Sequence, residues 1–213
     1  TVTAALAQVV LEAAQQAVGG ATVQTGRPTT PTSGSTPHVV QLYLYQVLPN
    51  GALRNADLPA RGGDGGFTRR PQVALDLDYL LAFYGDEATL EPERMLGAVV
   101  GVLHAHPVLT RRAIGDAVAG NVDLANSDLA DAVERGRFTP VSLSLDELSK
   151  LWSVFFQTPH TLSVVYRASV VLIEAEETAH QALPVLRRGE AGRGVETLLS
   201  PFPRLDGVRI GWP

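Results

Sequence analysis

Alternating apolar and polar residues predict three long strands. The clearest alternation runs over 72–84, and similar patterns run over 39–48 and 161–174. Because successive side chains of a strand point to opposite faces, each of these segments should have one apolar face against a core. Their valine, isoleucine and tyrosine residues also favour strands. A shorter strand is expected over 141–143.

Apolar residues at helical spacing predict helices around these strands. The first is expected over 2–17, and Gly19-Gly20 should end it because glycine adopts the left-handed conformation without strain. The segment 91–104 is apolar on almost every side, and we expect it to be the most buried helix. Two shorter helices are expected over 111–119 and 128–135.

The sequence Ser-Leu-Asp-Glu at 144–147 predicts the start of a further helix. Serine followed three residues later by glutamate is a capping box, in which both side chains satisfy backbone N–H groups of the first turn. The apolar side of this helix ends in aromatic residues. Trp152, Phe155 and Phe156 are therefore predicted to anchor the helix in the core, and a ligand-binding role for these rings is the less favoured alternative.

Together these elements predict a mixed α+β domain with helices packed on a mainly antiparallel sheet. Residues 1–183 are assigned to this domain, and its Thr/Pro-rich stretch 21–37 is expected to be a loop. Residues 184–213 are assigned to a C-terminal arm, because prolines and glycines interrupt any long helix or strand there.

The arm nevertheless carries three large apolar side chains, Phe202, Ile210 and Trp212. Burial of such groups is favourable, so they are expected to dock on a protein surface. Two possibilities stay open at this point. The arm either folds back over its own sheet or reaches another subunit, for example by adding a strand to an exposed sheet edge.

Composition excludes several classes of protein. The 213 residues carry a net charge of −5, which disfavours a nucleic-acid-binding or polybasic membrane-surface protein. Cysteine is absent, which excludes disulfide frameworks, thiolate catalysis and cysteine-based zinc sites. No apolar run reaches the ~18 residues of a membrane-spanning helix. Charged residues make up 18%, below the usual ~25%, which suggests that a partner covers some of the surface.

Candidate catalytic and metal-binding groups are few. Asp76 and Asp78 fall on the polar positions of the strand 72–84, where we expect both carboxylates to face solvent or a partner. His104 and His106 stand two positions apart near a helix end, so their imidazoles are not expected to converge on a metal. The glycine-rich stretch 61–66 lacks the lysine and the following helix of a phosphate-binding loop. No catalytic site is therefore predicted.

Several stretches together resemble one protein family. The most specific are LSLDELSKLW at 143–152 and FFQTP at 155–159, and they are joined by VQLYLYQV at 40–47, PNGALRN at 49–55, ALDLDYLL at 74–81, HAHPVL at 104–109 and LSVVY at 162–166. In this order they resemble the N-terminal domain of the cap, or tail-terminator, proteins of phage-tail-like contractile injection systems of bacteria.

The resemblance implies a structural protein without catalytic activity, cofactor or metal. It implies a homohexameric ring on the baseplate-distal end of the inner tube and sheath, which stops polymerisation. It further implies assembly in the cytoplasm and no contact with nucleic acid or membrane interior, and it leaves open whether the particle is released. Candidate contacts with a neighbouring subunit or the sheath are Asp76, Asp78, Phe202, Ile210 and Trp212.

Two other functions stay open from the residues alone. One is an α+β adaptor or small-ligand-binding domain. The other, less favoured, is a hydrolase or transferase that uses Asp76 and Asp78, since paired carboxylates can perform acid–base chemistry.

Overall fold

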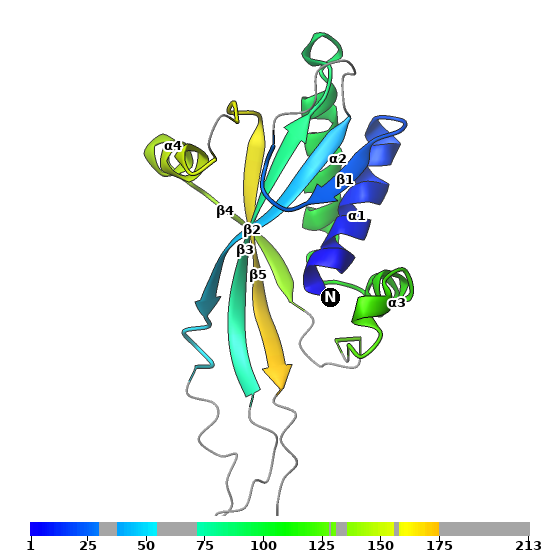
Figure 1. Cartoon of the computed structure of the whole chain (residues 1–213), viewed down its shortest axis with the longest axis vertical. Coiled ribbons are helices and arrows are strands. Elements are labelled where there is room, and N and C mark those ends of the chain that lie inside the picture. The colour runs from blue at the N-terminus through cyan, green and yellow to red at the C-terminus, as the bar shows by residue number, and fades with distance from the viewer. Residues whose placement is uncertain (30–37, 55–71, 128, 131–135, 156–157, 175–213) are drawn as a thin grey trace, which may run out of the picture.

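The computed structural model describes residues 1–29, 38–54, 72–127, 129–130, 136–155 and 158–174. These form a five-stranded sheet in the order β1-β2-β3-β5-β4 (Figure 1). The strands are β1 (Thr22–Thr25), β2 (Val39–Pro49), β3 (Gln72–Tyr84), β4 (Arg137–Val141) and β5 (Ser163–Glu174). Only β1 and β2 pair in parallel, and every other pair is antiparallel. The predicted mixed, mainly antiparallel α+β fold is therefore confirmed.

Helices cover both faces of this sheet. Three of them, α1 (Val2–Ala17), α2 (Glu91–Ala105) and α3 (Arg111–Ala119), lie on one side, and α4 (Leu145–Ser153) lies on the other (Figure 1). Two short 3-10 turns, η2 (Glu87–Thr89) and η3 (Val122–Leu124), connect elements on the first side.

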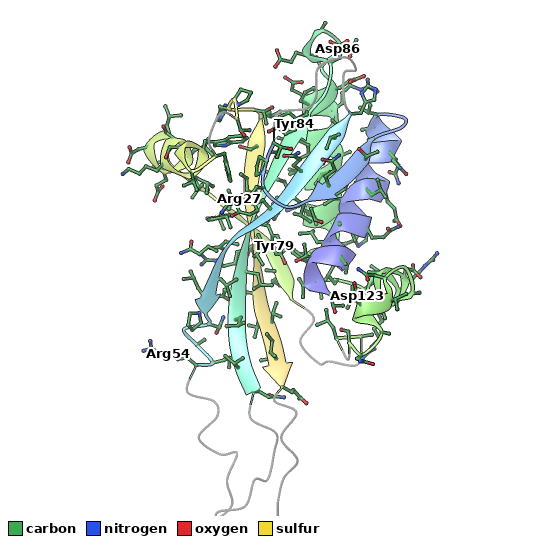
Figure 2. The ribbon with its side chains drawn as sticks, in the orientation of Figure 1. Arg27, Arg54, Tyr79, Tyr84, Asp86 and Asp123 are labelled. Carbon is green, nitrogen blue, oxygen red and sulfur yellow. The ribbon has the colours of Figure 1, made fainter. Side chains whose placement is uncertain are left out.

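The larger core lies between the sheet and the three helices. Tyr79 is fully buried at its centre, and its hydroxyl group shares a 2.9 Å hydrogen bond with Thr3 Oγ1 of α1 (Figure 2). The helix α1 contacts α2, α3 and β1, and it buries the side chains Val2, Ala5, Leu6, Val10, Ala13 and Ala14. The expectation that 91–104 forms the most buried helix is thus wrong. This segment forms α2, which buries one stripe of residues, Pro92, Met95, Val99 and Leu103. The reason is that α1 lies between α2 and α3 at the centre of the helical layer.

A second core lies under α4. The capping box predicted at Ser144 and Glu147 is confirmed, and the helix directs Trp152 onto β3 and β5. The structure places Trp152 and Phe155 among the buried side chains of this core, together with Val39, Leu80, Ala82, Tyr84 and Val165. The Trp152 indole N–H also donates to Ser163 Oγ over 3.2 Å. Phe156 lies outside the described residues.

Other sequence expectations differ from the structure in detail. The strand expected over 141–143 occupies Arg137–Val141 instead, directly after Gly136, whose φ of +76° requires the freedom of glycine. The stretch 21–37 is not all loop, because Thr22–Thr25 pairs with the start of β2. The helix expected over 128–135 and the arm 184–213 lie wholly or mainly outside the described residues.

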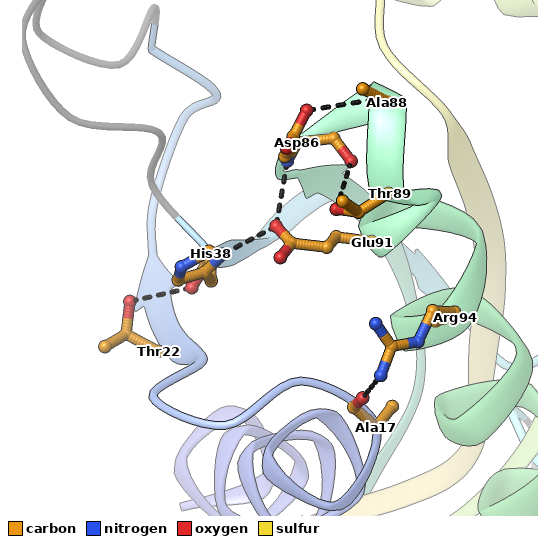
Figure 3. Close-up of polar contacts among 8 residues, drawn as sticks. All are labelled: Ala17, Thr22, His38, Asp86, Ala88, Thr89, Glu91 and Arg94. Carbon is orange, nitrogen blue, oxygen red and sulfur yellow. Dashed lines mark hydrogen bonds and ion pairs between the residues drawn. The ribbon is translucent and has the colours of Figure 1, made fainter.

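A polar junction joins the start of β2 to the start of α2 (Figure 3). The Glu91 carboxylate accepts the Asp86 backbone N–H at 2.8 Å and the His38 Nδ1–H at 2.6 Å. Hydrogen bonding from the Asp86 backbone, with a smaller contribution from His38, lowers the pKa of Glu91 below its ordinary value. In the same region, the Arg94 guanidinium donates to the Ala17 carbonyl at the end of α1. The His38–Glu91 contact therefore ties α2 to the sheet, and the Arg94–Ala17 contact ties α2 to α1.

Truncation of Trp152 tests the role of the second core. The variant Trp152→Ala should lower the free energy of unfolding by about 3–5 kcal/mol, because it leaves a cavity among buried side chains. Val154→Ala, at a position 63% exposed on the same segment, is the matched control and should change it by less than about 0.5 kcal/mol. Denaturant unfolding measures both. A Trp152→Ala protein that unfolds like the control would contradict the anchoring role.

The junction predicts an acid-sensitive contribution to stability. Because the pKa of Glu91 is lowered in the folded state, its contribution is present above its ordinary value of 4.5 and is lost as the pH falls through the folded value. The variant Glu91→Gln should therefore melt below the wild type near neutral pH, and the gap should close on acidification. Melting curves across this range check it, with the exposed Glu93→Gln as control. A gap that is independent of pH would contradict the assignment.

Candidate assembly surface

The sheet continues beyond the helices as a three-stranded ribbon. We call this part the distal ribbon and define it as residues 46–49 of β2, 72–77 of β3 and 170–174 of β5. It projects away from the helical layer, and Arg54 lies near its far end (Figures 1 and 2). Within the described chain, neither neighbouring edge strand reaches it, since β1 pairs only with Val39–Leu42 and β4 only with Val165–Ser169. Both edges of the ribbon are thus without a strand partner there.

Two β-bulges mark the start of the distal ribbon. In β2 the bulge inserts Tyr45, so that Leu44 pairs with Tyr79 and Gln46 pairs with Asp78. In β5 two residues, 169 and 170, stand opposite Asp76. Such bulges increase the right-handed twist and bend the strand. The ribbon accordingly turns away from the body of the sheet (Figure 1).

The bulges also reverse the alternation that the sequence predicted for β2 and β5. An uninterrupted alternation over 39–48 would put Leu48 on the same face as Leu44, but Leu48 pairs with Asp76 on the opposite face. The pattern also placed Val170 on the core face of β5, and the structure puts Val171 there instead. Each inserted residue shifts the period of two by one position, so side chains beyond it exchange faces.

Asp78 lies between the two bulges and forms an ion pair with Arg167. The guanidinium donates Nε–H to Asp78 Oδ1 at 2.7 Å and Nη2–H to Oδ2 at 2.9 Å, a bidentate geometry. Asp78 is 1% exposed, so the expectation that it faces solvent or a partner is wrong. The reason is that Arg167, on the paired strand β5, covers and neutralises the carboxylate.

The charges of this pair affect neighbouring groups. The hydrogen bonds that Arg167 donates to the Asp78 carboxylate raise the pKa of Arg167, which keeps the guanidinium charged. Burial raises the pKa of Tyr45, the Asp78 carboxylate adds to this, and Arg167 opposes it. Asp78 is buried, and both of its carboxylate oxygens accept hydrogen bonds from Arg167. They are therefore occupied by an internal contact and are not presented to a substrate.

Asp76 has a different role, in the turn after β2. It is half-buried, and Asn50 Nδ2 donates to its Oδ1 at 2.8 Å. Asn50 in turn accepts the backbone N–H groups of Ala52 and Leu53 at 3.1 Å each, and its own N–H donates to the Ala74 carbonyl. Asp76 therefore orients the asparagine that shapes this turn. The two aspartates do not converge on a shared site, since their partners belong to different elements.

One face of the distal ribbon is apolar, and the described residues leave much of it uncovered. Register places Val47, Pro49, Val73, Leu75 and Ile173 on the same side as the larger core. Leu75 is half-buried and packs against that core, whereas the other four side chains are exposed. Val73 and Ile173 are directly paired, and they are 47% and 51% exposed. Contiguous exposed apolar groups of this kind mark sites that contact another protein segment.

The other candidate groups form no site in the described chain. His104 and His106 are both exposed at the end of α2, and the described residues contain no group of three metal-ligating side chains. An apolar pocket of about 240 Å³ lies beside the edge of β5 and is lined by Leu148, Val164 and Tyr166, among others. Among the described helices, none is long and apolar enough to cross a membrane. Phe202, Ile210 and Trp212 lie outside the described residues.

Sequence reasoning missed Arg167 and Asn50. Arg167 is the only charged residue between Ser163 and Ile173, and a lone charge in an apolar strand requires a buried partner or an exposed face. That signal indicated a partner for Arg167 but could not name Asp78. Asn-Gly is a common turn sequence, but nothing local to Asn50 and Gly51 points to Asp76 as a partner.

The ion pair predicts an asymmetric response to mutation. The variant Arg167→Met should lower the free energy of unfolding by about 3–5 kcal/mol, because it leaves the Asp78 carboxylate buried without a counter-charge. Lys150→Met breaks an ion pair of the same 2.7 Å length whose two side chains are 74% exposed, and it should cost less than about 1 kcal/mol. Urea denaturation of both variants compares them. Equal costs would show that Asp78 is not held by this pair.

Comparisons with known proteins agree with the fold. The sequence model of the Pvc16 N-terminal domain family matches residues 1–187. No curated protein matches the chain. Among solved structures, the sheath/tube terminator of the extracellular contractile injection system PVC in its extended state is similar, with a TM-score of 0.57 and 16% identity over 92% of this chain. The tube-terminating cap of the anti-feeding prophage AFP is similar with a TM-score of 0.50 and 16% identity over 84% of this chain.

The chain spans 64% and 57% of the lengths of these two relatives. At this identity the structural likeness establishes a common fold, while the family match covers most of the sequence and confirms the resemblance seen there. The chain therefore belongs to the Pvc16 N-terminal domain family.

Proposed function

We propose that this protein is a structural cap that terminates the tube and sheath of a contractile injection system. In this role it binds the baseplate-distal end of both polymers, stops their growth and stabilises the last sheath layer. The observation that carries the proposal is the match of the family over 1–187, together with a fold similar to a sheath/tube terminator and a tube-terminating cap.

A ring of six copies is part of the proposal. In a closed cyclic ring each subunit contacts its two neighbours through two different surfaces. The distal ribbon is compatible with this requirement, because its β2 edge and its β5 edge differ in sequence and neither has a strand partner in the described chain. The low share of charged residues, 18% of the chain, further supports contact with other protein surfaces.

The proposed partners are the sheath protein, the inner tube protein and further copies of this chain. Assembly would take place in the cytoplasm of a bacterium, before release of the particle. Asp76 stays a candidate contact because it is only half-buried. Asp78 is buried and is no longer proposed as a contact, and its ion pair with Arg167 joins β3 to β5. Phe202, Ile210 and Trp212 stay predicted contacts.

The alternative functions have less support. The apolar pocket of about 240 Å³ is smaller than the ~300–1,000 Å³ of common ligand pockets, and its lining offers few polar groups to orient a ligand. A hydrolase or transferase that uses Asp76 and Asp78 is disfavoured by their separate partners, Asn50 and Arg167.

Deletion of the protein from its particle tests the proposal. Without a cap, tube and sheath should grow without a fixed end, and electron micrographs should show tails of variable length or unstable sheaths. Complementation with the wild-type chain should restore uniform tails. Complementation with Lys150→Met, which alters an exposed ion pair, should do so equally well.

End views of complemented particles test the ring. Averaging without imposed symmetry should give six-fold density at the end distal to the baseplate. Uniform and stable tails in the deletion strain would overturn the cap function, and a cap of another symmetry would overturn the hexamer alone.

A further inference from the structure

We propose that the apolar face of the distal ribbon is a docking surface for the segment 175–213 of the same chain. The surface consists of Val47, Pro49, Val73, Leu75 and Ile173. This inference concerns the free protein and does not depend on the cap function.

The apolar face of the distal ribbon extends the larger core beyond the helices that cover it. It continues the larger core without interruption, because Leu75 pairs with Val171 and Leu77 pairs with Ala168, and Leu77, Val171 and Ala168 are buried. One row further along, Val73 and Ile173 remain about half exposed, since α1 and α3 do not extend over the ribbon. At the β2 edge of the same face, Val47 is 49% exposed.

The position at which the chain leaves the sheet supports this occupant. The segment 175–213 follows Glu174 directly, and Glu174 pairs with Gln72 in the row next to Val73 and Ile173. Extended backbone covers about 3.3 Å per residue, so a dozen residues would run back along the whole of β5. Docking on the face therefore requires only a reversal of chain direction, for which the segment has ample length.

The composition of the segment fits an apolar surface. It is interrupted by proline and glycine, yet its apolar side chains include Leu183, Leu186, Val195, Leu198, Leu199, Phe202, Ile210 and Trp212. Leu198 and Leu199 are adjacent, and Phe202 follows them closely. An extended strand with such residues could also pair with the open edge of β5. Over 170–174 this edge contains Val170 and Leu172, and its one charged residue is Glu174.

The size of the face favours a tethered segment over a second molecule. A stable interface between separate proteins engages roughly 20–30 residues on each partner, far more than the five side chains of this face. A covalently attached segment is present at an effective concentration in the millimolar range, so a small surface is sufficient to hold it. A second copy of the chain has no such advantage in dilute solution.

Photo-crosslinking of the full chain tests the proposal. Benzoylphenylalanine is introduced at Val73 in one protein and at Ile173 in another. The matched control carries it at Val122, which is 91% exposed on η3. Each protein is mixed in equal amounts with an isotopically heavy copy, irradiated while dilute, and mapped by mass spectrometry.

The expected result is a crosslink from positions 73 and 173 to peptides of 175–213 within one chain, with isotopically unmixed products. The control at 122 should give none of these. Mixed light–heavy products would assign the face to a second copy and overturn the proposal. Crosslinks no more frequent than at 122 would overturn it as well.

A proteolysis experiment checks the same contact without the probe. The double variant V73S/I173S makes the face polar at exposed positions, so the fold should be retained, and a melting curve verifies this. Trypsin should then cleave after Arg187, Arg193 and Arg204 several-fold faster than in the wild type, while V122S should behave like the wild type. Unchanged cleavage of V73S/I173S would contradict docking on this face.

Discussion

The central strand β3 must bury both of its faces, and most of the structure depends on this constraint. It is paired with β2 and β5 along its length, so its backbone groups are satisfied within the sheet. Tyr79 and Leu81 face the three helices, whereas Leu80 and Ala82 face α4. The single helix α4 therefore completes a second core, and its capping box and Trp152 hold it there.

The Asp78–Arg167 pair lies where this two-sided burial ends. Residues of β3 from 79 onwards have apolar cover on both sides, while residues before 78 enter the distal ribbon. Asp78 and Arg167 pair directly across the two strands. The bulge in β2 lies immediately before the residue paired with Asp78, and the bulge in β5 begins two residues after Arg167. A bidentate ion pair is directional and loses its geometry when strands slip. The pair thus adds a directional contact to the apolar packing that sets the register between these two irregular strand pairings.

This arrangement separates a rigid body from a protruding surface. The body contains both cores and the His38–Glu91 junction. In the described part of the chain, the distal ribbon buries only Ala74, Leu77 and Val171, and neither of its edges has a strand partner. The proposed cap function would use such a division, with the body keeping its shape and the ribbon available for contacts. The same division explains why no catalytic constellation forms in the described chain, since its polar groups serve turns, caps and strand register.

Local interactions allowed the sequence to determine most elements. The bounds of β3, α1 and α3 were predictable, because alternation, helical spacing and glycine or proline signals depend on neighbours within a few residues. The capping box at Ser144 was predictable for the same reason. A mainly antiparallel α+β fold followed from the order of these elements.

Tertiary structure decided what depends on residues far apart in the chain. The strand β1 has little apolar alternation and forms only because β2 offers it an edge. The two bulges, which reverse the faces of Leu48 and Val170, are set by pairing with β3 and leave no mark on the local pattern. The local pattern assigned Asp78 to a polar surface position, because its partner Arg167 lies 89 residues further along the chain. A period of two assigns side chains to faces, but only packing determines which faces are covered.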